Sequence, residues 1–381
     1  MSEIENSLAI FRNAFPRDEQ VYLNNAGVAP MCRPAIDAAK DLAEKMGQGI
    51  FQISSMLEQY ELARGQFARL VGARPDHVSM TQTCAASISL AALGIPLEQG
   101  AEIVTWEQEY PSNAYPWFEA ARRVGGTVRR VPSSGDWNLD TEKLLAAITA
   151  KTRVVAVSWV QFQTGAMTDL QRLSAACQEQ GAWLVVDAIQ GLGILPFDLE
   201  QMGVDVVCGG THKWLCGPLG HGFVAFAEGR RDEVAPLMHG AFTYGTPEDV
   251  PQPENQPRQD PYRFEPGAPL LFGAAAGAAA IAWLHEAGIE RLYLQASRLS
   301  RKLAEGILQQ GGKVLSCLEG QGEQQLRSPI TTVVPAGDVE RAIQRLREAK
   351  IAHAARAGGI RLAPHGFNTD DDVEAVLDAL A

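Results

Sequence analysis

The sequence predicts an α/β protein with a mostly parallel sheet that helices cover on both faces. Short apolar runs rich in β-branched residues alternate with amphipathic stretches of helical period. Parallel strands need long crossover connections, so this alternation indicates βαβ units. The chain has 381 residues, of which 46% are hydrophobic, and this length exceeds that of a typical single domain. We therefore expect two domains and a large core.

The N-terminal part of the chain supplies the elements of the expected sheet. Apolar, β-branched composition predicts strands at Glu102–Trp106, Thr127–Val131, Val154–Trp159, Trp183–Asp187, Asp205–Gly209 and Gly222–Ala227. Amphipathic spacing predicts helices at Pro34–Met46, Tyr60–Leu70, Ser112–Val124, Thr141–Ile148 and Asp169–Gln180. Ligands of such sheets bind at the carboxyl ends of the strands, so the residues that follow these strands are candidates for a site.

Seven prolines between Pro247 and Pro269 interrupt the pattern and predict an extended loop. Its composition is compatible with a functional ordered loop and with a disordered surface loop. A long helical region, Gly273–Gln310, follows. A smaller α/β unit is then expected from Ser328–Val334, Asp338–Lys350, Gly359–Ala363 and Thr369–Leu380. We predict an N-terminal segment at residues 1–30, a large domain at 31–287 and a small domain at 288–381.

Charge and composition exclude several classes of partner. The formal net charge is -12 and the basic residues form no cluster, so neither nucleic acid nor a membrane surface is an expected partner. The N-terminus lacks the pattern of a targeting signal. The apolar stretch Gly267–Leu284 is rich in alanine and glycine and favours a buried helix over a membrane span. Six scattered cysteines suggest no disulfide framework and fit a cytoplasmic protein.

The stretch DVVCGGTHKWLCGPLGHG, from Asp205 to Gly222, has two possible interpretations. Its cysteine and histidine residues at spacings of four, namely Cys208, His212 and Cys216, would share one face of a helix and could bind zinc. The pairs Gly209-Gly210 and Gly217-Pro218 oppose a continuous helix, which disfavours a metal site. The cysteines then become ordinary small core residues.

The second interpretation concerns the lysine in the same stretch. Lys213 follows a strand in uncharged surroundings, where partial burial would lower its pKa and free the amine for covalent chemistry. Asp187 ends the preceding buried strand, where an unpaired carboxylate is rare, although a capping role remains an alternative. Pyridoxal phosphate needs both groups, an amine for its aldehyde and a carboxylate for its ring nitrogen. The small-residue stretch Met80–Gly94 could supply helix N–H groups to a phosphate.

This combination resembles the class V aminotransferases of fold type I, which depend on pyridoxal phosphate. The resemblance rests on the run Asp187–Gln190 and on Thr211-His212-Lys213-Trp214 with Gly217-Pro218 downstream. It extends over YLNNAGVAP (Tyr22–Pro30), EYPSNAYPW (Glu109–Trp117) and RAGGIRLAPHGFNTDDD (Arg356–Asp372). It implies a large domain with a mostly parallel seven-stranded sheet, a smaller C-terminal α/β domain, and an active site at a homodimer interface near the proline-rich loop.

The resemblance also implies roles for single residues. Lys213 would bind the cofactor and act as the acid or base at the substrate Cα, and Asp187 would pair with the ring nitrogen. Arg361 would bind the substrate α-carboxylate, and Asn25 would border the substrate. The remaining cofactor-binding residues would contact the ring, its phenolic oxygen or the phosphate; they are Tyr110, Gln190, His212, Thr211 and the backbone N–H groups of Cys84 and Ala85.

Four departures from the family pattern bear on the expected reaction and on the phosphate and ring contacts. Cysteine desulfurases carry a mobile cysteine shortly before the substrate arginine, whereas no cysteine follows Cys317 here. The family's Gly-Thr-Pro is replaced by Gly267-Ala268-Pro269, and Gly210 and Phe162 also stand where relatives carry other residues. We expect an L-amino acid substrate and Cα deprotonation, with a C–S β-lyase as the leading hypothesis. Transamination, epimerisation and desulfurase-like activity remain alternatives, as do a zinc- or nucleotide-binding protein and a non-catalytic cofactor-binding protein.

Overall fold

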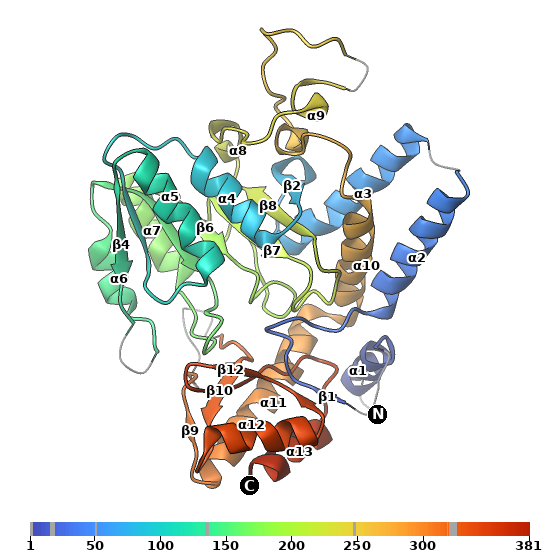
Figure 1. Cartoon of the computed structure of the whole chain (residues 1–381), viewed down its shortest axis with the longest axis vertical. Coiled ribbons are helices and arrows are strands. Elements are labelled where there is room, and N and C mark those ends of the chain that lie inside the picture. Colours follow the sequence, from blue (N-terminus) through green and yellow to red (C-terminus); the bar gives the residue numbers. More distant parts are fainter. Residues whose placement is uncertain are drawn as a thin grey trace.

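The computed structural model describes residues 3–15, 20–49, 52–133, 137–246, 249–317, 319 and 326–381. Pro247, the first proline of the expected loop, lies outside these ranges. A large body contains the main sheet, and a smaller body contains the C-terminal elements (Figure 1). This α/β architecture is the predicted one.

The large body is built on a seven-stranded sheet of order β2-β8-β7-β6-β5-β3-β4. The strands are β2 (Val78–Thr81), β3 (Glu102–Trp106), β4 (Thr127–Val131), β5 (Thr152–Ser158), β6 (Trp183–Asp187), β7 (Val206–Gly210) and β8 (Gly222–Phe226). Only β8 runs antiparallel to its neighbours, β7 and β2, and the other pairs are parallel. The loop between β7 and β8 is too short for a parallel crossover, which needs a dozen or more residues.

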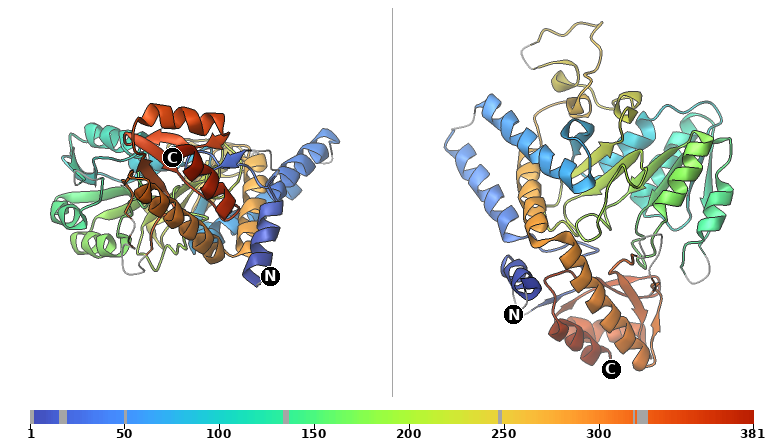
Figure 2. Two further views of the ribbon diagram at one scale, coloured as in Figure 1. Left: turned by 90° about the horizontal axis from the view of Figure 1, so that it is seen from below. Right: turned by 180° about the vertical axis from the view of Figure 1, so that it is seen from behind.

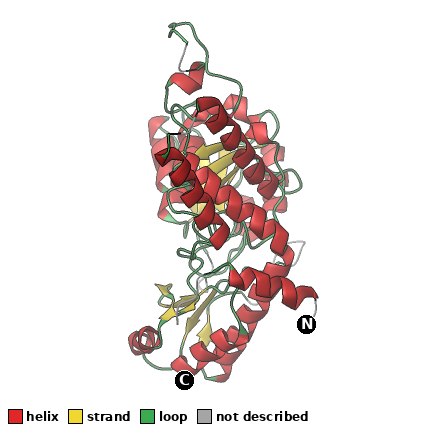
Figure 3. Cartoon of the chain, turned by 90° about the vertical axis from the view of Figure 1, so that its right-hand side faces the viewer, coloured by secondary structure: helices red, strands yellow, loops and turns green. Residues whose placement is uncertain are grey.

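Successive residues of the central strands pack into different cores. In β5, Val155 and Val157 join one hydrophobic cluster, whereas Val154 and Ala156 join the other. This alternation follows from the period of two in a strand and explains the continuous apolar runs in the sequence. Helices therefore enclose the sheet from both sides (Figure 3).

The helices divide between these two cores. The face with Val154 is covered by α4 (Cys84–Gly94) and α5 (Tyr115–Arg123). The opposite face carries α2 (Arg33–Gly47), α3 (Ile53–Val71), α6 (Thr141–Ala147), α7 (Leu170–Gln180) and α10 (Leu271–Ala287). Short helical elements complete the body: η1 (Pro75–His77), η2 (Pro111–Asn113), α8 (Arg230–Glu233), α9 (Ala241–Tyr244) and η3 (Pro261–Phe264). The alanine-rich α10 is a packed core helix, and none of the described helices is long and apolar enough to cross a membrane.

The smaller body has a four-stranded antiparallel sheet of order β12-β13-β10-β9 and its own hydrophobic cluster. Its elements are α11 (Ile289–Gln309), β9 (Lys313–Val314), β10 (Thr331–Val334), α12 (Val339–Glu348), β11 (Ile351–Ala352), β12 (Ala354–Arg356), β13 (Gly359–Leu362) and α13 (Asp370–Leu380). Gly288 separates α10 from α11 with a φ of 84°, which glycine adopts without strain. These two helices join the bodies (Figure 2), and the domain boundary expected near residue 288 remains a prediction.

The N-terminal segment contacts both bodies. It contains α1 (Glu3–Asn13) and β1 (Val21–Tyr22), which pairs in parallel with β11. Ala29 and Cys32 then donate backbone hydrogen bonds to His212 and Cys216 of the loop after β7, at 2.8 and 3.0 Å.

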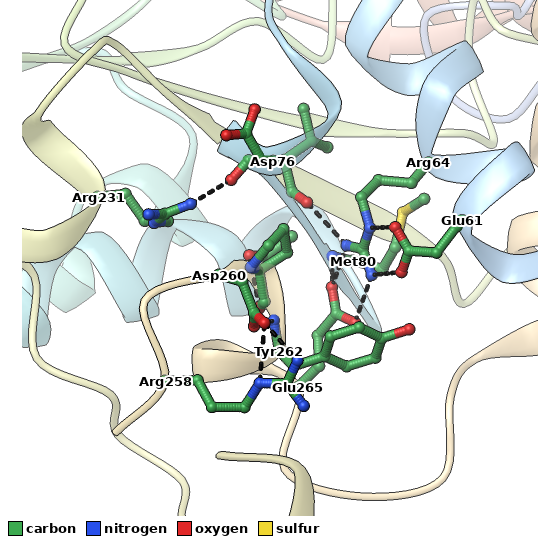
Figure 4. Close-up of polar contacts among 12 residues, drawn as sticks. Glu61, Arg64, Asp76, Met80, Arg231, Arg258, Asp260, Tyr262 and Glu265 are labelled. Atoms are coloured by element: carbon green, nitrogen blue, oxygen red, sulfur yellow. Dashed lines mark hydrogen bonds and ion pairs between the residues drawn. The ribbon is translucent and has the colours of Figure 1, made fainter. Parts of the chain in front are cut away.

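A buried ion pair fixes the end of the proline-rich loop to the large body (Figure 4). Arg64 of α3 contacts Glu265 at 2.6 Å, and both side chains are nearly inaccessible to solvent. Glu265 also accepts a 2.7 Å hydrogen bond from the backbone of Met80 in β2. The described part of the loop before it, residues 249–260, has no helix or strand and extends from the large body at the top of Figure 1.

Candidate active site

A cavity of about 380 Å³ lies at the carboxyl ends of β5, β6 and β7. Arg361 enters it from the smaller body, and residues 26–28 of the N-terminal segment form another wall. Eight of the predicted site residues line it: Cys84, Ala85, Tyr110, Asp187, Gln190, His212, Lys213 and Arg361. Thr211 and Asn25 are not among its lining residues.

Lys213 sits on a tight loop closed by backbone hydrogen bonds. Thr211 N–H donates to the His221 carbonyl at 3.2 Å and Cys216 N–H donates to the Lys213 carbonyl at 2.9 Å. The amine lies 5.7 Å from the centroid of the Tyr110 ring. Burial lowers the pKa of Lys213 to about 8, and the carboxylate of Asp187 opposes that shift. A large fraction of the amine is therefore neutral near pH 8 and able to act as a nucleophile or base.

Asp187 ends β6 and its carboxyl group is almost completely buried. It accepts hydrogen bonds from the backbone N–H of Ile189 at 3.0 Å and from the thiol of Cys84 at 3.4 Å. Burial raises the pKa of Asp187, and the Ile189 N–H and the charge of Lys213 oppose the rise. The carboxyl group thus lines the cavity and still has capacity for a cationic partner.

The N-terminus of α4 forms an anion-binding wall of the cavity. Thr83 caps this 11-residue helix by accepting a 3.0 Å hydrogen bond from Ala86 N–H. The preceding N–H groups, those of Cys84 and Ala85, have no acceptor within the helix and carry its positive dipole end. A Cβ at Gly222 would lie 2.5 Å from the Thr83 carbonyl carbon, so only glycine lets β8 approach this turn. Such a helix start fits a phosphate group.

Gln190, His212 and Thr211 have distinct surroundings. Gln190 donates to the Ala26 carbonyl at 2.9 Å and accepts from the Trp214 indole at 3.1 Å, which fixes its amide at the cavity edge. Burial, with a smaller contribution from Lys213, lowers the pKa of His212 to about 4, so its imidazole is neutral at pH 7. The Thr211 hydroxyl donates instead to backbone carbonyls of its own loop.

Arg361 lies in β13 and is 2% exposed. Its guanidinium donates to the Phe162 carbonyl at 2.6 Å and to the Asn24 side chain at 3.3 Å. Burial, and then the charge of Arg356, lowers the pKa of Arg361 to about 10, which leaves it cationic at neutral pH. Within the described residues no carboxylate pairs with it and its Nε has no hydrogen-bond partner. This side chain can therefore take an anionic substrate group.

Sequence reasoning missed some of the residues that shape this end of the cavity. Asn24, not Asn25, contacts Arg361, whereas Asn25 donates to the Ala363 carbonyl at 2.7 Å. The adjacent asparagines of YLNNAGVAP indicated that this segment borders the site, but the sequence could not show which of the two contacts Arg361. Arg356, at the tip of the β12–β13 hairpin, also lines the cavity and was present in the motif RAGGIR.

Comparison with known proteins identifies the family of this chain. The family model described as Aminotransferase class-V matches residues 21–367. The chain belongs to the aminotransferase class-V family. A probable cysteine desulfurase of Aeropyrum pernix is 31% identical over 79% of this chain and 76% of its own length. The chain is a pyridoxal-phosphate-dependent enzyme, as predicted.

Solved structures confirm the predicted fold type I. The apo cysteine desulfurase from Thermococcus onnurineus NA1 superposes with a TM-score of 0.87 at 23% identity, covering 97% of this chain and 96% of the other. The cystine C–S lyase C-DES, in complex with cysteine persulfide, superposes with a TM-score of 0.85 at 23% identity and covers 95% and 97%. Both similarities extend over the large and the small body.

The residues of the cavity fit the cofactor of the family. A buried amine, a buried carboxylate and a helix start that favours anions line one cavity, and they match the aldehyde, ring nitrogen and phosphate of pyridoxal phosphate. Among the described residues no group of three or more His, Cys, Asp or Glu side chains could hold a metal ion.

Proposed function

We propose that this enzyme is a C–S β-lyase that acts on cysteine-type L-amino acids after removing the Cα proton. The observation that supports this proposal most strongly concerns the thiol of Cys84, the one cysteine among the described residues that lines the cavity. Its thiol is buried and donates to Asp187, and burial raises its pKa well above the ordinary value. A protonated, fixed thiol cannot serve as the mobile sulfur acceptor of a desulfurase, because the thiolate is the nucleophile.

The proposed roles follow from the positions of the side chains. Pyridoxal phosphate supplies, when bound, an electron sink that stabilises negative charge at Cα. Lys213 would hold this cofactor and then accept the Cα proton, which its lowered pKa favours at pH 8. Asp187 would keep a proton on the ring nitrogen. Arg361 would bind the α-carboxylate through charge-assisted hydrogen bonds.

The walls of the cavity would complete this arrangement. Tyr110 and Phe162 pack edge to face with ring centroids 5.1 Å apart and would cover the reacting groups. The N–H groups of Cys84 and Ala85 would bind the phosphate. The fold shared with a cystine C–S lyase is compatible with this assignment, and so is the relationship to a probable cysteine desulfurase, since both names imply sulfur amino acids.

Product analysis tests the assignment. The holoenzyme is incubated with L-cysteine, cystine or L-alanine, with and without a keto acid. Pyruvate and ammonia should form from the sulfur substrates alone, without a keto acid, and Lys213→Ala should abolish both products. Activity that requires a keto acid would replace the lyase by an aminotransferase. A persulfide detected on the protein by mass spectrometry would replace it by a desulfurase.

We also propose that the enzyme is a homodimer with the domain division 1–30, 31–287 and 288–381. Exposed Leu237 and Met238 lie with Ala268 around an apolar hollow of about 440 Å³ beside the start of α4. Exposed apolar side chains around a hollow support a contact surface for a second copy of the chain. Sedimentation of the holoenzyme at twice the chain mass would support the dimer, and sedimentation at the chain mass would refute it.

A further inference from the structure

Glu109 is a buried carboxyl group next to the cavity, immediately before Tyr110. It is 7% exposed and accepts four hydrogen bonds. The backbone N–H of Ser158 donates at 2.7 Å, the Ser158 hydroxyl donates to the second oxygen, and the amides of Asn113 and Gln161 donate at 3.0 Å each. No described lysine, arginine or histidine forms a salt bridge with it.

These four donors come from the segments that form one side of the cavity. Asn113 belongs to the turn of Tyr110, to whose carbonyl its N–H donates at 2.7 Å. Ser158 ends β5 and is the register partner of Asp187 in β6. Gln161 precedes Phe162, whose carbonyl accepts the 2.6 Å hydrogen bond of Arg361.

We propose that Glu109 is a positioning residue for substrate binding. Its carboxylate fixes the Tyr110 turn and the Phe162 loop relative to each other, and through the Phe162 carbonyl it sets the orientation of Arg361. This inference rests on the proposed function only in that Arg361 binds the substrate carboxylate. Glu109 itself does not line the cavity, so it acts through Tyr110, Phe162 and Arg361.

The same geometry makes the arrangement sensitive to pH. A protonated carboxyl group becomes a donor, yet three of the four groups facing Glu109 are donors alone, namely the Ser158 N–H and the NH₂ groups of Asn113 and Gln161, and only the Ser158 hydroxyl can also accept. Burial raises the pKa of Glu109 to about 7, the Ser158 and Asn113 hydrogen bonds oppose the rise, and the charge of Asp187 on β6 adds to it. Below pH 7 the protonated group would therefore either reverse the direction of the Ser158 hydroxyl contact or lose one of the other contacts.

Kinetics of Glu109→Gln in the holoenzyme, with L-cysteine as substrate, test the proposal. A glutamine replaces one acceptor oxygen by an NH₂ donor, which opposes the amide donor of either Asn113 or Gln161, so KM should rise about tenfold at pH 8, the effect of one lost buried hydrogen bond, while kcat changes little. In the wild type KM should rise as the pH falls through 7, and this dependence should disappear in the variant. Glu107→Gln is the matched control, because Glu107 lies two residues earlier and is 52% exposed.

Two further measurements keep the test independent of turnover and of folding. Infrared difference spectra of the protein between pH 6 and 8 should show a protonated carboxyl band that Glu109→Gln lacks. Binding of 3-mercaptopropionate, measured by calorimetry, should weaken about tenfold in the variant. If the wild-type enzyme binds this probe but releases no pyruvate from cysteine, the lyase assignment is refuted. The comparison of probe affinity between wild type and Glu109→Gln then still tests the positioning role of Glu109.

A second variant separates positioning from a general loss of structure. Gln161→Leu removes only the link between Glu109 and the Phe162 loop, and we expect it to raise KM while Tyr110 keeps its turn. Wild-type KM and probe affinity in both variants would overturn the proposal. So would a pH dependence of KM that persists in Glu109→Gln.

Discussion

The imidazole of His221 should make the fold sensitive to acid. His221 is 1% exposed, and neither ring nitrogen has a hydrogen-bond partner. It packs edge to face on Phe67 at 5.3 Å and lies against α10, where a Cβ at Gly273 would be 2.6 Å from its Nδ1. Burial lowers its pKa from 6.5 to about 3. Protonation in these apolar surroundings would leave an uncompensated charge.

The sign and size of the effect follow from this pKa shift. Below pH 6.5 the His221 imidazole binds a proton in the unfolded chain but not in the folded chain, so the free energy of unfolding falls as the pH decreases. At pH 5, which lies 1.5 units below the unfolded pKa and above the folded one, the loss is about 2 kcal/mol at 1.36 kcal/mol per unit. His221→Leu should remove this share of the pH dependence.

Urea unfolding of wild type and His221→Leu at pH 7 and pH 5 measures the difference. The variant should lose about 2 kcal/mol less than the wild type between these pH values. It will still lose some stability, because burial also lowers the pKa of His212 and of His365 to about 4. His239→Leu is the control, since this side chain is exposed. Equal losses in wild type and His221→Leu would refute the reasoning.

Three other substitutions have clear expected outcomes. Lys213→Ala should remove the absorbance band of bound cofactor and lower the rate by at least about 10²–10⁴-fold, and a retained band would contradict its role. Glu265→Ala leaves Arg64 with Glu61 as its remaining carboxylate partner and leaves the buried Met80 N–H without its acceptor, so it should cost about 1–3 kcal/mol in urea unfolding, whereas no measurable loss would show that the pair is dispensable. Gly222→Ala places a Cβ 2.7 Å from Cys84 N and should weaken cofactor binding to the apoenzyme about tenfold, as reported by titration; unchanged affinity would refute the close approach.

The pattern of apolar residues along the sequence predicted elements whose position in the fold is set by burial of their side chains. The strand Trp183–Asp187 was predicted to the residue, because both of its faces are buried and its composition is uniformly apolar until Asp187. The convergence of Asp187 and Lys213 followed from the rule that neighbouring parallel strands end at one edge. The predicted helix Ser112–Val124 is divided into η2 and α5, because Pro116 is suited to a first turn and not to a helix interior.

Features that depend on long-range register could not be predicted. Asn24 forms a bridge with Ala363, and the alternation of an extended chain then turns the side chains of Asn24 and Asn25 to opposite sides. The four donors around Glu109 come from residues up to 52 positions away in sequence. Thr211 was expected to contact the cofactor, and that remains a prediction, although its hydroxyl donates to the Pro218 and His221 carbonyls because the loop folds back on itself.

The path of the N-terminal segment has a mechanical consequence. Its β1 pairs with β11 of the smaller body, residues 26–28 line the cavity, and Ala29 and Cys32 hold the lysine loop of the large body. A rotation of the smaller body about Gly288 would therefore strain the N-terminal segment, because this segment is attached to both sides of the cavity. Any such rotation must either shift the segment along the cavity wall or break its backbone hydrogen bonds to the loop that carries Lys213. Domain movement and access to Lys213 are thus mechanically linked by a stretch of chain that contributes side chains to the cores of both bodies.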